Sequence, residues 1–303
     1  MKIPFIKYSK IWFSLSGFLT LLAIIFLATW GLKLGIDFTG GSLMEVSFAQ
    51  SRPPIEQLHK TLETANVNDA VVQSLADNKY LIRSRFLSED EHQSLLAKVK
   101  NDFQTNGNTV SEERFETIGA SVSSQLRQRA IWAIILVNFA IIIYIAYAFR
   151  GVSRPVASWK YGALAIIALF HDVLVVLGAF AVLGHFAGIE VGIDFVVALL
   201  TVLGFSVTDT IVVYDRVREN LTRAGSDDFA EVVNRGLNDT LMRSINTTLT
   251  VLLPLFALFY FGGASIHSFT LALLIGMASG AYSSIFIASP LLVTAERLQR
   301  RAR

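Results

Sequence analysis

The stretch from Gly192 to Tyr214 reads GIDFVVALLTVLGFSVTDTIVVY, and it decides what kind of fold this chain can adopt. About twenty apolar residues in a helix are long enough to cross a hydrocarbon core roughly 30 Å thick. Asp209 lies well inside this run, and an acid at the centre of a span costs roughly 2.5–3.5 kcal/mol on insertion scales. The stretch therefore predicts a transmembrane helix that presents Asp209 to the interior of a helix bundle.

Five more apolar runs of this kind lie on either side of the first. They cover residues 11–30, 131–149, 161–183, 243–262 and 266–290. The composition agrees, because 53% of the residues are hydrophobic and only 17% are charged, whereas about a quarter are charged in soluble domains. The sequence therefore predicts an α-helical polytopic membrane protein with six transmembrane helices.

The first run follows Lys2, Lys7 and Lys10, so it has to be distinguished from a cleaved signal peptide. Its apolar part is longer than the roughly 7–15 residues of such a peptide. In addition, Ala28-Thr29-Trp30 is a poor cleavage site. We interpret the run as an uncleaved anchor.

Lysine and arginine are sorted between the short connecting segments. They occur in residues 1–10, 150–160, 215–242 and 291–303, and are absent from 184–191 and 262–265. Cytoplasmic loops are enriched in these residues, so the pattern predicts a cytoplasmic N-terminus and a basic cytoplasmic tail. Segment 215–242 is then a cytoplasmic amphipathic connector. Its helix lies either on the inner membrane surface or against the bundle, and the sequence leaves both open.

Residues 31–130 are polar and form an external domain between the first two spans, which is periplasmic if the host has an outer membrane. Apolar periodicity predicts strands at 43–48, 71–75, 80–86 and 109–118, and helices at 54–65 and 88–103. This order of elements is that of a ferredoxin-like α+β sandwich. A long external segment is translocated across the membrane regardless of its own charge, so the lysines and arginines of this segment do not contradict its external location.

A polar stripe marks the start of the fifth span. Arg243, Asn246, Thr247 and Thr250 follow one another at helical spacing and share one face. Lipid cannot solvate such a stripe, so it should face other helices or water. The fourth and fifth spans are antiparallel, which makes a pair between Asp209 and Arg243 geometrically reasonable. Such a pair either binds and releases a proton or only stabilises the packing of the two helices. The sequence leaves both interpretations open.

Asp172 is a third ionisable group within a span, and it follows His171 near the middle of the third apolar run. A relay role and a packing role are equally compatible with the sequence. In the sixth span, Gly276 and Gly280 follow a small-xxx-small pattern, as do Ser279 and Ser283. We interpret this pattern as close helix packing without chemistry.

Several classes of function are excluded or disfavoured. The chain has no cysteine, which excludes disulfides and thiolate metal sites, and its net charge of +2 does not suggest a nucleic-acid binder. The phosphate loop, the HExxH zinc motif and the GxSxG nucleophile elbow are all missing from the sequence. The chain is therefore not expected to be an enzyme or an ATPase, and we expect no metal and no cofactor except protons.

Four motifs resemble those of the SecD/SecF family of membrane proteins. The run Gly35-Ile36-Asp37-Phe38-Thr39-Gly40-Gly41 is similar to the signature that follows the first span. The others are Ala168–Val173 in the third span, Gly204–Asn220 in the fourth and Thr240–Thr248 at the start of the fifth. The resemblance runs along the whole chain, and the small external region favours the SecF branch over SecD.

This resemblance implies a function and a set of partners. Proteins of the SecF branch pair with SecD in a twelve-helix unit similar to resistance-nodulation-division pumps, of which six helices are half. That unit associates with the SecYEG channel in the bacterial inner membrane and uses the proton motive force to finish export after the ATPase SecA has acted. The implied partners also include YajC, YidC, the translocating preprotein and membrane lipid, but no nucleic acid.

The resemblance also implies roles for individual residues. It implies that Asp209 and Arg243 take part in proton conduction, and the polar stripe of the fifth span indicates the same two residues. Further candidates for the proton pathway are Asp172, Asn246 and Thr247. Two rival hypotheses are also compatible with the sequence. One is a proton-driven permease for small molecules or lipids, and the other is a scaffold that conducts no protons.

Overall fold

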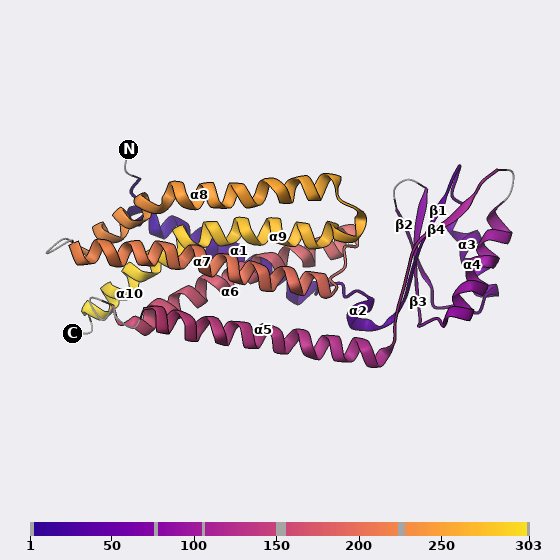
Figure 1. The fold of residues 1–303 in the computed structure, drawn as a ribbon, viewed down its shortest axis with the longest axis horizontal. Coiled ribbons are helices and arrows are strands. Elements are labelled where there is room, and N and C mark those ends of the chain that lie inside the picture. Colours follow the sequence, from indigo (N-terminus) through magenta and orange to yellow (C-terminus); the bar gives the residue numbers. More distant parts are fainter. Residues whose placement is uncertain (1–2, 76–77, 105–106, 150–155, 224–227, 302–303) are drawn as a thin grey trace. The chain divides into compact units, whose positions relative to one another are not determined.

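The structure is a computed structural model that describes residues 3–75, 78–104, 107–149, 156–223 and 228–301 (Figure 1). The chain divides into two compact units. One comprises Met1–Lys33 and Ile131–Arg303, and it holds the long helices. The other comprises Leu34–Ala130 and holds the sheet.

Six helical spans among the described residues are long and apolar enough to cross a membrane. They are built from α1 (Ser9–Thr29), α5 (Ala120–Ala148), α6 (Ser158–Ala187), α7 (Ile193–Arg223), α8 (Phe229–Phe261) and α9 (Ala264–Ser283), the last of which continues through a π-helix (Ser284–Ala288) into α10 (Ser289–Arg301). Helices satisfy their own backbone hydrogen bonds, which lipid cannot do for them. The predicted six-helix membrane fold is confirmed, and the chain is a multi-pass membrane protein.

The central helices of the bundle are α6, α7 and α9, in whose spans at least half of the residues are buried, whereas few residues in the spans of α1, α5 and α8 are buried. Glycine allows close contact between α7 and α9. A Cβ on Gly276 would lie 2.3 Å from Val202 Cγ2, and a Cβ on Gly280 would lie 2.8 Å from Ser206 Cβ. These glycines therefore bring α9 directly against the polar face of α7.

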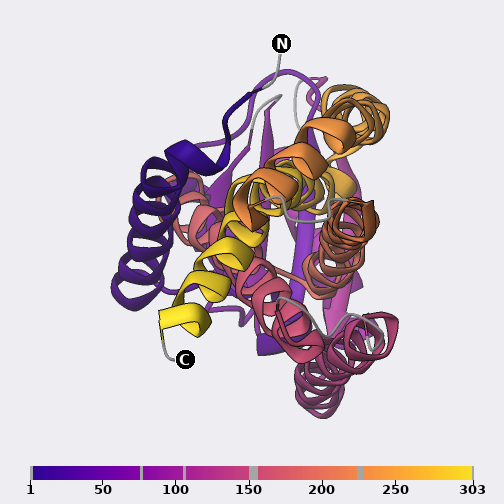
Figure 2. The ribbon, with the colours of Figure 1, turned by 90° about the vertical axis from the view of Figure 1, so that its left-hand side faces the viewer.

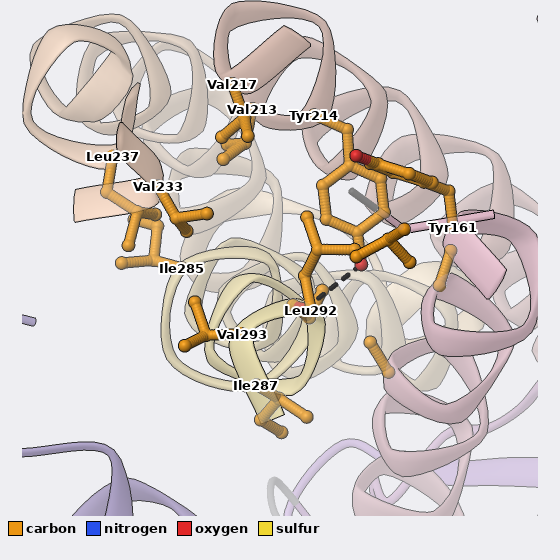
Figure 3. Close-up of a cluster of buried hydrophobic side chains, with 14 of the residues drawn as sticks. Tyr161, Val213, Tyr214, Val217, Val233, Leu237, Ile285, Ile287, Leu292 and Val293 are labelled. Atoms are coloured by element: carbon orange, nitrogen blue, oxygen red, sulfur yellow. Dashed lines mark hydrogen bonds between the residues drawn. The ribbon is translucent and has the colours of Figure 1, made fainter. Parts of the chain in front are cut away.

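One buried cluster joins α6, α7, α8 and α10 at one end of the bundle (Figure 3). Figure 2 shows the ribbon from this end. The Tyr214 hydroxyl donates to the Ala288 carbonyl oxygen at 3.0 Å, which ties α7 to the end of the π-helix. The Tyr161 ring meets Tyr214 edge-on at 5.4 Å. The first and last described segments both lie at this end of the bundle, as an even number of crossings requires (Figure 1).

The predicted connector 215–242 is not a separate helix. Instead α7 continues to Arg223 and α8 begins at Phe229, so most of the segment belongs to two long helices. The apolar face of Val232, Val233 and Leu237 is fully buried. Gly236 lies so close to α7 that its Cβ would be 2.8 Å from Val217 Cγ2. The alternative of a connector packed against the bundle is therefore the one observed, because this face extends the helix contact beyond the apolar run.

Other helices also continue past their apolar runs. Helix α5 begins at Ala120 rather than at residue 131, so its first turns lie within the range 31–130 predicted for the domain. The tail 291–303 is helical to Arg301 as part of α10. Hydropathy marks where side chains become polar, whereas the helix ends where its backbone hydrogen bonds end, so the two limits differ.

The second unit has the predicted ferredoxin-like fold. Its elements are a short helix α2 (Ile36–Thr39), β1 (Gly41–Phe48), α3 (Ile55–Thr64), β2 (Val71–Ser74), β3 (Lys79–Ser84), α4 (Glu89–Phe103) and β4 (Val110–Ile118). The strand order is β2-β3-β1-β4, and all neighbouring strands are antiparallel. Side chains of α3 and α4, among them Leu58, Leu62 and Leu95, pack with Met44, Val46 and Ile82 of the sheet in one core.

Candidate functional site

Asp172 of α6 lies at the centre of the bundle and is completely buried. Three serine hydroxyls donate to its carboxylate: Ser206 to Oδ2 at 2.6 Å, Ser283 to Oδ2 at 2.7 Å and Ser279 to Oδ1 at 2.8 Å. His171 Nδ1 lies 3.2 Å from Oδ1. A carboxylate has about four lone-pair sites, so these groups can satisfy all of them when Nδ1 carries the proton.

The serines come from α7 and α9, so Asp172 is the point where three helices are joined by hydrogen bonds. The sequence alone predicts only close helix packing for Ser279 and Ser283. The sequence does contain a signal for their role as hydrogen-bond donors. A buried carboxylate requires donors, and serines recur on the neighbouring spans. We therefore name Asp172, Ser206, Ser279 and Ser283 the serine–aspartate cluster.

Asp209 of α7 is half-buried, and its main partner is Ser244 of α8. The Ser244 hydroxyl lies 2.7 Å from each of the two carboxylate oxygens. The Ser284 hydroxyl also lies near this carboxylate. Its oxygen is hydrogen-bonded to the Thr210 hydroxyl at 2.9 Å. Asp209 thus lies near hydroxyl groups of α8 and the π-helix, as Asp172 lies among those of α7 and α9.

Arg243 is near Asp209, but it is not the residue that holds the carboxylate. Within the described parts of the chain Arg243 makes no ion pair, although its charge acts on Asp209. Both residues line a cavity of about 170 Å³, together with Phe205, Thr208 and Thr247. Among the described residues, Asp209 and Arg243 thus lie at one cavity without the expected direct pair, and Ser244 is the hydrogen-bond partner of Asp209.

The polar stripe of α8 faces away from its own bundle. Arg243, Asn246, Thr247 and Thr250 are all exposed in this chain, whereas Ser244 and Thr248 on the adjoining face are buried. Of the predicted site residues, the structure therefore brings together Asp209, Arg243 and Thr247 at one cavity. It places Asn246 on the same outer face and Asp172 in the separate serine–aspartate cluster.

The two acids are connected through the last residue of α9 and the first residue of the π-helix. Ser283 donates to Asp172, and Ser284 lies beside Asp209 and Thr210. Both serine hydroxyls also contact the Gly280 carbonyl oxygen, at 3.1 Å and 2.9 Å. The π-helix begins at Ser284. Such local widening of a helix is frequent at functional sites, and here it lies where the chain serves both carboxylates.

The glycine signature of residues 35–41 forms the entry into the sheet. Gly35 precedes α2, and its carbonyl oxygen accepts a hydrogen bond from the Thr39 hydroxyl at 3.0 Å. Gly40 and Gly41 have φ angles of +75° and +117°, which side-chain-bearing residues rarely adopt. A Cβ on Gly41 would lie 2.5 Å from the Ser84 carbonyl oxygen. The signature, with Asp37 and Phe38 in α2, therefore shapes the start of β1.

No group of three or more histidine, aspartate or glutamate side chains in the described residues could hold a metal ion. The two carboxylates can accept a proton, hold it in a hydrogen bond and release it. Together with the fold, these sites define a multi-pass membrane protein with two interior carboxylates and an inserted ferredoxin-like domain.

Comparison with known proteins narrows this class to one family. Residues 98–298 match the family described as protein export membrane protein SecD/SecF, C-terminal. Residues 25–51 match the SecD/SecF GG motif, which includes Gly40 and Gly41. The chain belongs to the SecD/SecF family of protein-export membrane proteins.

Relatives with high similarity are protein translocase subunits SecF. The protein from Thermobaculum terrenum is 42% identical over 97% of this chain and 94% of its own length. The protein from Anaerolinea thermophila is 39% identical over 93% of this chain and 91% of its own length. The resemblance to the SecF branch is thereby confirmed, and the chain is a membrane component of protein translocation.

The fold also matches solved structures. The crystal structure of SecDF, a translocon-associated membrane protein from Thermus thermophilus, has a TM-score of 0.82 and 30% sequence identity. A SecDF structure in a super-membrane-facing form has a TM-score of 0.68. Both matches cover all of this chain, which spans only 39% and 40% of the respective SecDF chains.

Proposed function

We propose that this chain is the SecF subunit of a proton-driven export machine. Together with a SecD partner, it uses the proton motive force to complete protein translocation through the SecYEG channel after the ATP-driven step of SecA. Protons are its coupling ion, and the chain itself hydrolyses no ATP. It lies in the bacterial inner membrane with both termini in the cytoplasm and the domain outside, and YajC, YidC and the moving preprotein are further partners.

The observation that carries this proposal is the outward-facing polar stripe beside Asp209. Arg243, Asn246 and Thr247 are exposed on the surface of a helix that crosses the membrane. A guanidinium and a row of polar groups on a membrane-crossing helix are unfavourable against lipid. A second bundle that covers the stripe would remove this cost. The site therefore supports a required membrane partner, for which SecD is the natural candidate in this family.

Proton coupling follows from the chemistry at the covered stripe. Asp209 lies next to a cationic side chain and accepts a hydrogen bond from Ser244. Movement of a second bundle against this one changes the water and charge around the carboxylate, and with them its affinity for a proton. One charge that crosses 100 mV contributes about 2.3 kcal/mol, so cargo movement requires repeated cycles.

The serine–aspartate cluster provides a second protonation site on the proton pathway. Asp172 is linked toward Asp209 through Ser283 and Ser284, whose hydroxyls share the Gly280 carbonyl oxygen. A proton at Asp172 would replace one accepted hydrogen bond with a donated one, so a serine hydroxyl must rotate or His171 must change its tautomer. Protonation of Asp172 is thereby coupled to the contacts between α6, α7 and α9.

The test is export driven by the proton motive force in vesicles that contain SecYEG, SecA, SecD and this chain. Preprotein is stalled partway by removal of ATP, and a proton gradient is then applied. We expect Asp209→Asn to abolish the gradient-driven part of export and to leave the ATP-driven part unchanged. The matched control is Asp90→Asn, which removes an exposed acid of the domain and should behave as wild type.

The assay also separates the rival functions. If Asp209→Asn retains full gradient-driven export, the chain is a scaffold and the proposal is wrong. If the variant leaves secretion intact but makes cells sensitive to small toxic compounds, the chain is a permease and the proposal is equally wrong.

A further inference from the structure

A basic cavity of about 530 Å³ lies at the end of the bundle that contains the first and last described segments. It is lined by Lys7 and Lys10 before and within α1, by Arg235 and Glu231 of α8, and by Arg297 of α10. Among the described residues, four cationic side chains and one acidic side chain therefore line this hollow. Neither proton coupling nor cargo export assigns a role to this hollow.

The wall of this cavity is held in place by specific hydrogen bonds. The Ile3 backbone N–H donates to Asn238 Oδ1 at 2.8 Å, and the Ile6 N–H donates to Asn234 Oδ1 at 3.3 Å. In return, both asparagine side chains donate to the Ile3 carbonyl oxygen, at 3.1 Å and 2.9 Å. The N-terminal segment is thereby fastened along α8, which fixes the backbone that carries Lys7.

A second hollow of about 280 Å³ adjoins the first. It shares Lys10 and Arg297 with the first hollow and adds Arg301, and its apolar lining includes Phe13 and Leu298. Lys10 and Arg297 therefore stand between two hollows, each of which has at least one further cation of its own. We call the pair the basic hollows.

The position of the basic hollows limits what can occupy them. Lys10 lies in the first turns of α1 and Arg297 in α10, so both lie where membrane-crossing helices leave the apolar run. Basic pockets between helices at this level bind anionic lipid headgroups. Two adjacent cationic sites with an apolar flank match a lipid that has two phosphates joined by a short polar bridge and acyl chains beside them.

We propose that the basic hollows bind the headgroup of a diphosphatidylglycerol lipid, with one phosphate in each hollow and Lys10 and Arg297 shared between them. Guanidinium groups bind phosphate oxygens in a bidentate manner, and lysine acts as a point charge, so this set of residues suits phosphate. The bound lipid would join the N-terminal segment, α8 and α10.

The test is native mass spectrometry of the full-length chain in detergent, titrated with diphosphatidylglycerol, phosphatidylglycerol or phosphatidylcholine. We expect one diphosphatidylglycerol to bind most tightly and phosphatidylcholine not to bind specifically. The double variant Lys10→Gln/Arg297→Gln should weaken binding about thirtyfold, which is the loss expected for two cations at a membrane surface. The matched control is Arg218→Gln/Arg223→Gln, which removes two exposed cations of α7 outside the hollows and should change binding less than about twofold.

Three results would overturn the proposal. The first is equal binding by the Lys10→Gln/Arg297→Gln variant and wild type, and the second is equal binding of all three lipids. The third is displacement of the lipid by millimolar inorganic phosphate, which would make the hollows a site for free anions. Thermal unfolding without added lipid shows whether the double variant is folded. If it is not, Arg301→Gln, which affects only the second hollow, replaces it in the comparison of the three lipids.

Discussion

Ser283 and Ser284 are neighbours in the sequence, yet their hydroxyls serve two different acids. Ser283 donates to Asp172 Oδ2 at 2.7 Å, whereas Ser284 is bonded to Thr210 and lies beside Asp209. The division falls where α9 passes into the π-helix. This arrangement makes the last turn of α9 the structural link between the two interior carboxylates, and it leads to the first two predictions.

Replacement of Ser283 by alanine should destabilise the bundle. The change leaves the fully buried Asp172 carboxylate with one donor fewer, and an unsatisfied buried acceptor costs about 1–3 kcal/mol. We expect a lower unfolding temperature in detergent. Ser124→Ala is the control, because Ser124 is exposed and donates to the Ser121 carbonyl oxygen of its own helix. If both variants unfold at the same temperature, the serine–aspartate cluster does not stabilise the bundle.

Replacement of Gly280 by alanine should separate α9 from α7. The new Cβ would lie 2.8 Å from Ser206 Cβ and 3.2 Å from Ser206 Cα, so the helices must move apart. Such overpacking costs about 1–3 kcal/mol. We expect lower stability and faster amide hydrogen exchange in α7 and α9. Gly204→Ala serves as the comparison, since nothing lies within 4 Å of a Cβ there; equal exchange in the two variants would contradict the close contact.

Replacement of Gly41 by alanine should weaken the start of β1. The residue has a φ of +117°, and its Cβ would lie 2.5 Å from the Ser84 carbonyl oxygen. A residue with a side chain in such a conformation costs about 1–3 kcal/mol. Hydrogen exchange should therefore increase at the paired ends of β1 and β3. Gly17→Ala in α1 has open space around its Cβ and should leave the sheet unchanged.

The stability of α4 should depend on pH through Glu91. A hydrogen bond from Arg85 and others from Ser88 lower the pKa of this carboxyl to about 2. Because the pKa is lower in the folded state, the stabilisation is fully present above the usual pKa of about 4.5 and is lost as the pH falls toward about 2. Exchange protection of α4 should decrease over this range.

The control for this pH dependence is Glu91→Gln, which cannot ionise. Its α4 should be less protected than wild type at neutral pH, and its protection should change less between pH 4.5 and pH 2. An unchanged pH profile in Glu91→Gln would show that another group is responsible.

Much of the fold could be predicted from the sequence, because lipid and water impose strong patterns. The six apolar runs follow from the need of a membrane-crossing backbone to satisfy its own hydrogen bonds. The strand and helix order of the domain follows from periodicity and is observed in full. The connector 215–242 was less predictable, since its apolar face fits a membrane surface and the face of a neighbouring helix equally well.

The details of the site could not be predicted in the same way. The sequence places Arg243 and Ser244 on α8, but successive residues differ by about 100° around a helix, so its rotation decides which one meets Asp209. The structure has Ser244 inward and Arg243 outward. Similarly, Ser279 and Ser283 fit a packing pattern, and only their distances to Asp172 give them a further role.

The most direct test of the account is proton flux through liposomes that contain this chain and its SecD partner, followed with a pH-sensitive dye after a membrane potential is imposed. We predict flux with wild type, none with Asp209→Asn, and partial flux with Asp209→Glu, which retains a carboxyl group. Wild-type flux in Asp209→Asn would contradict the claim that this carboxylate carries the proton.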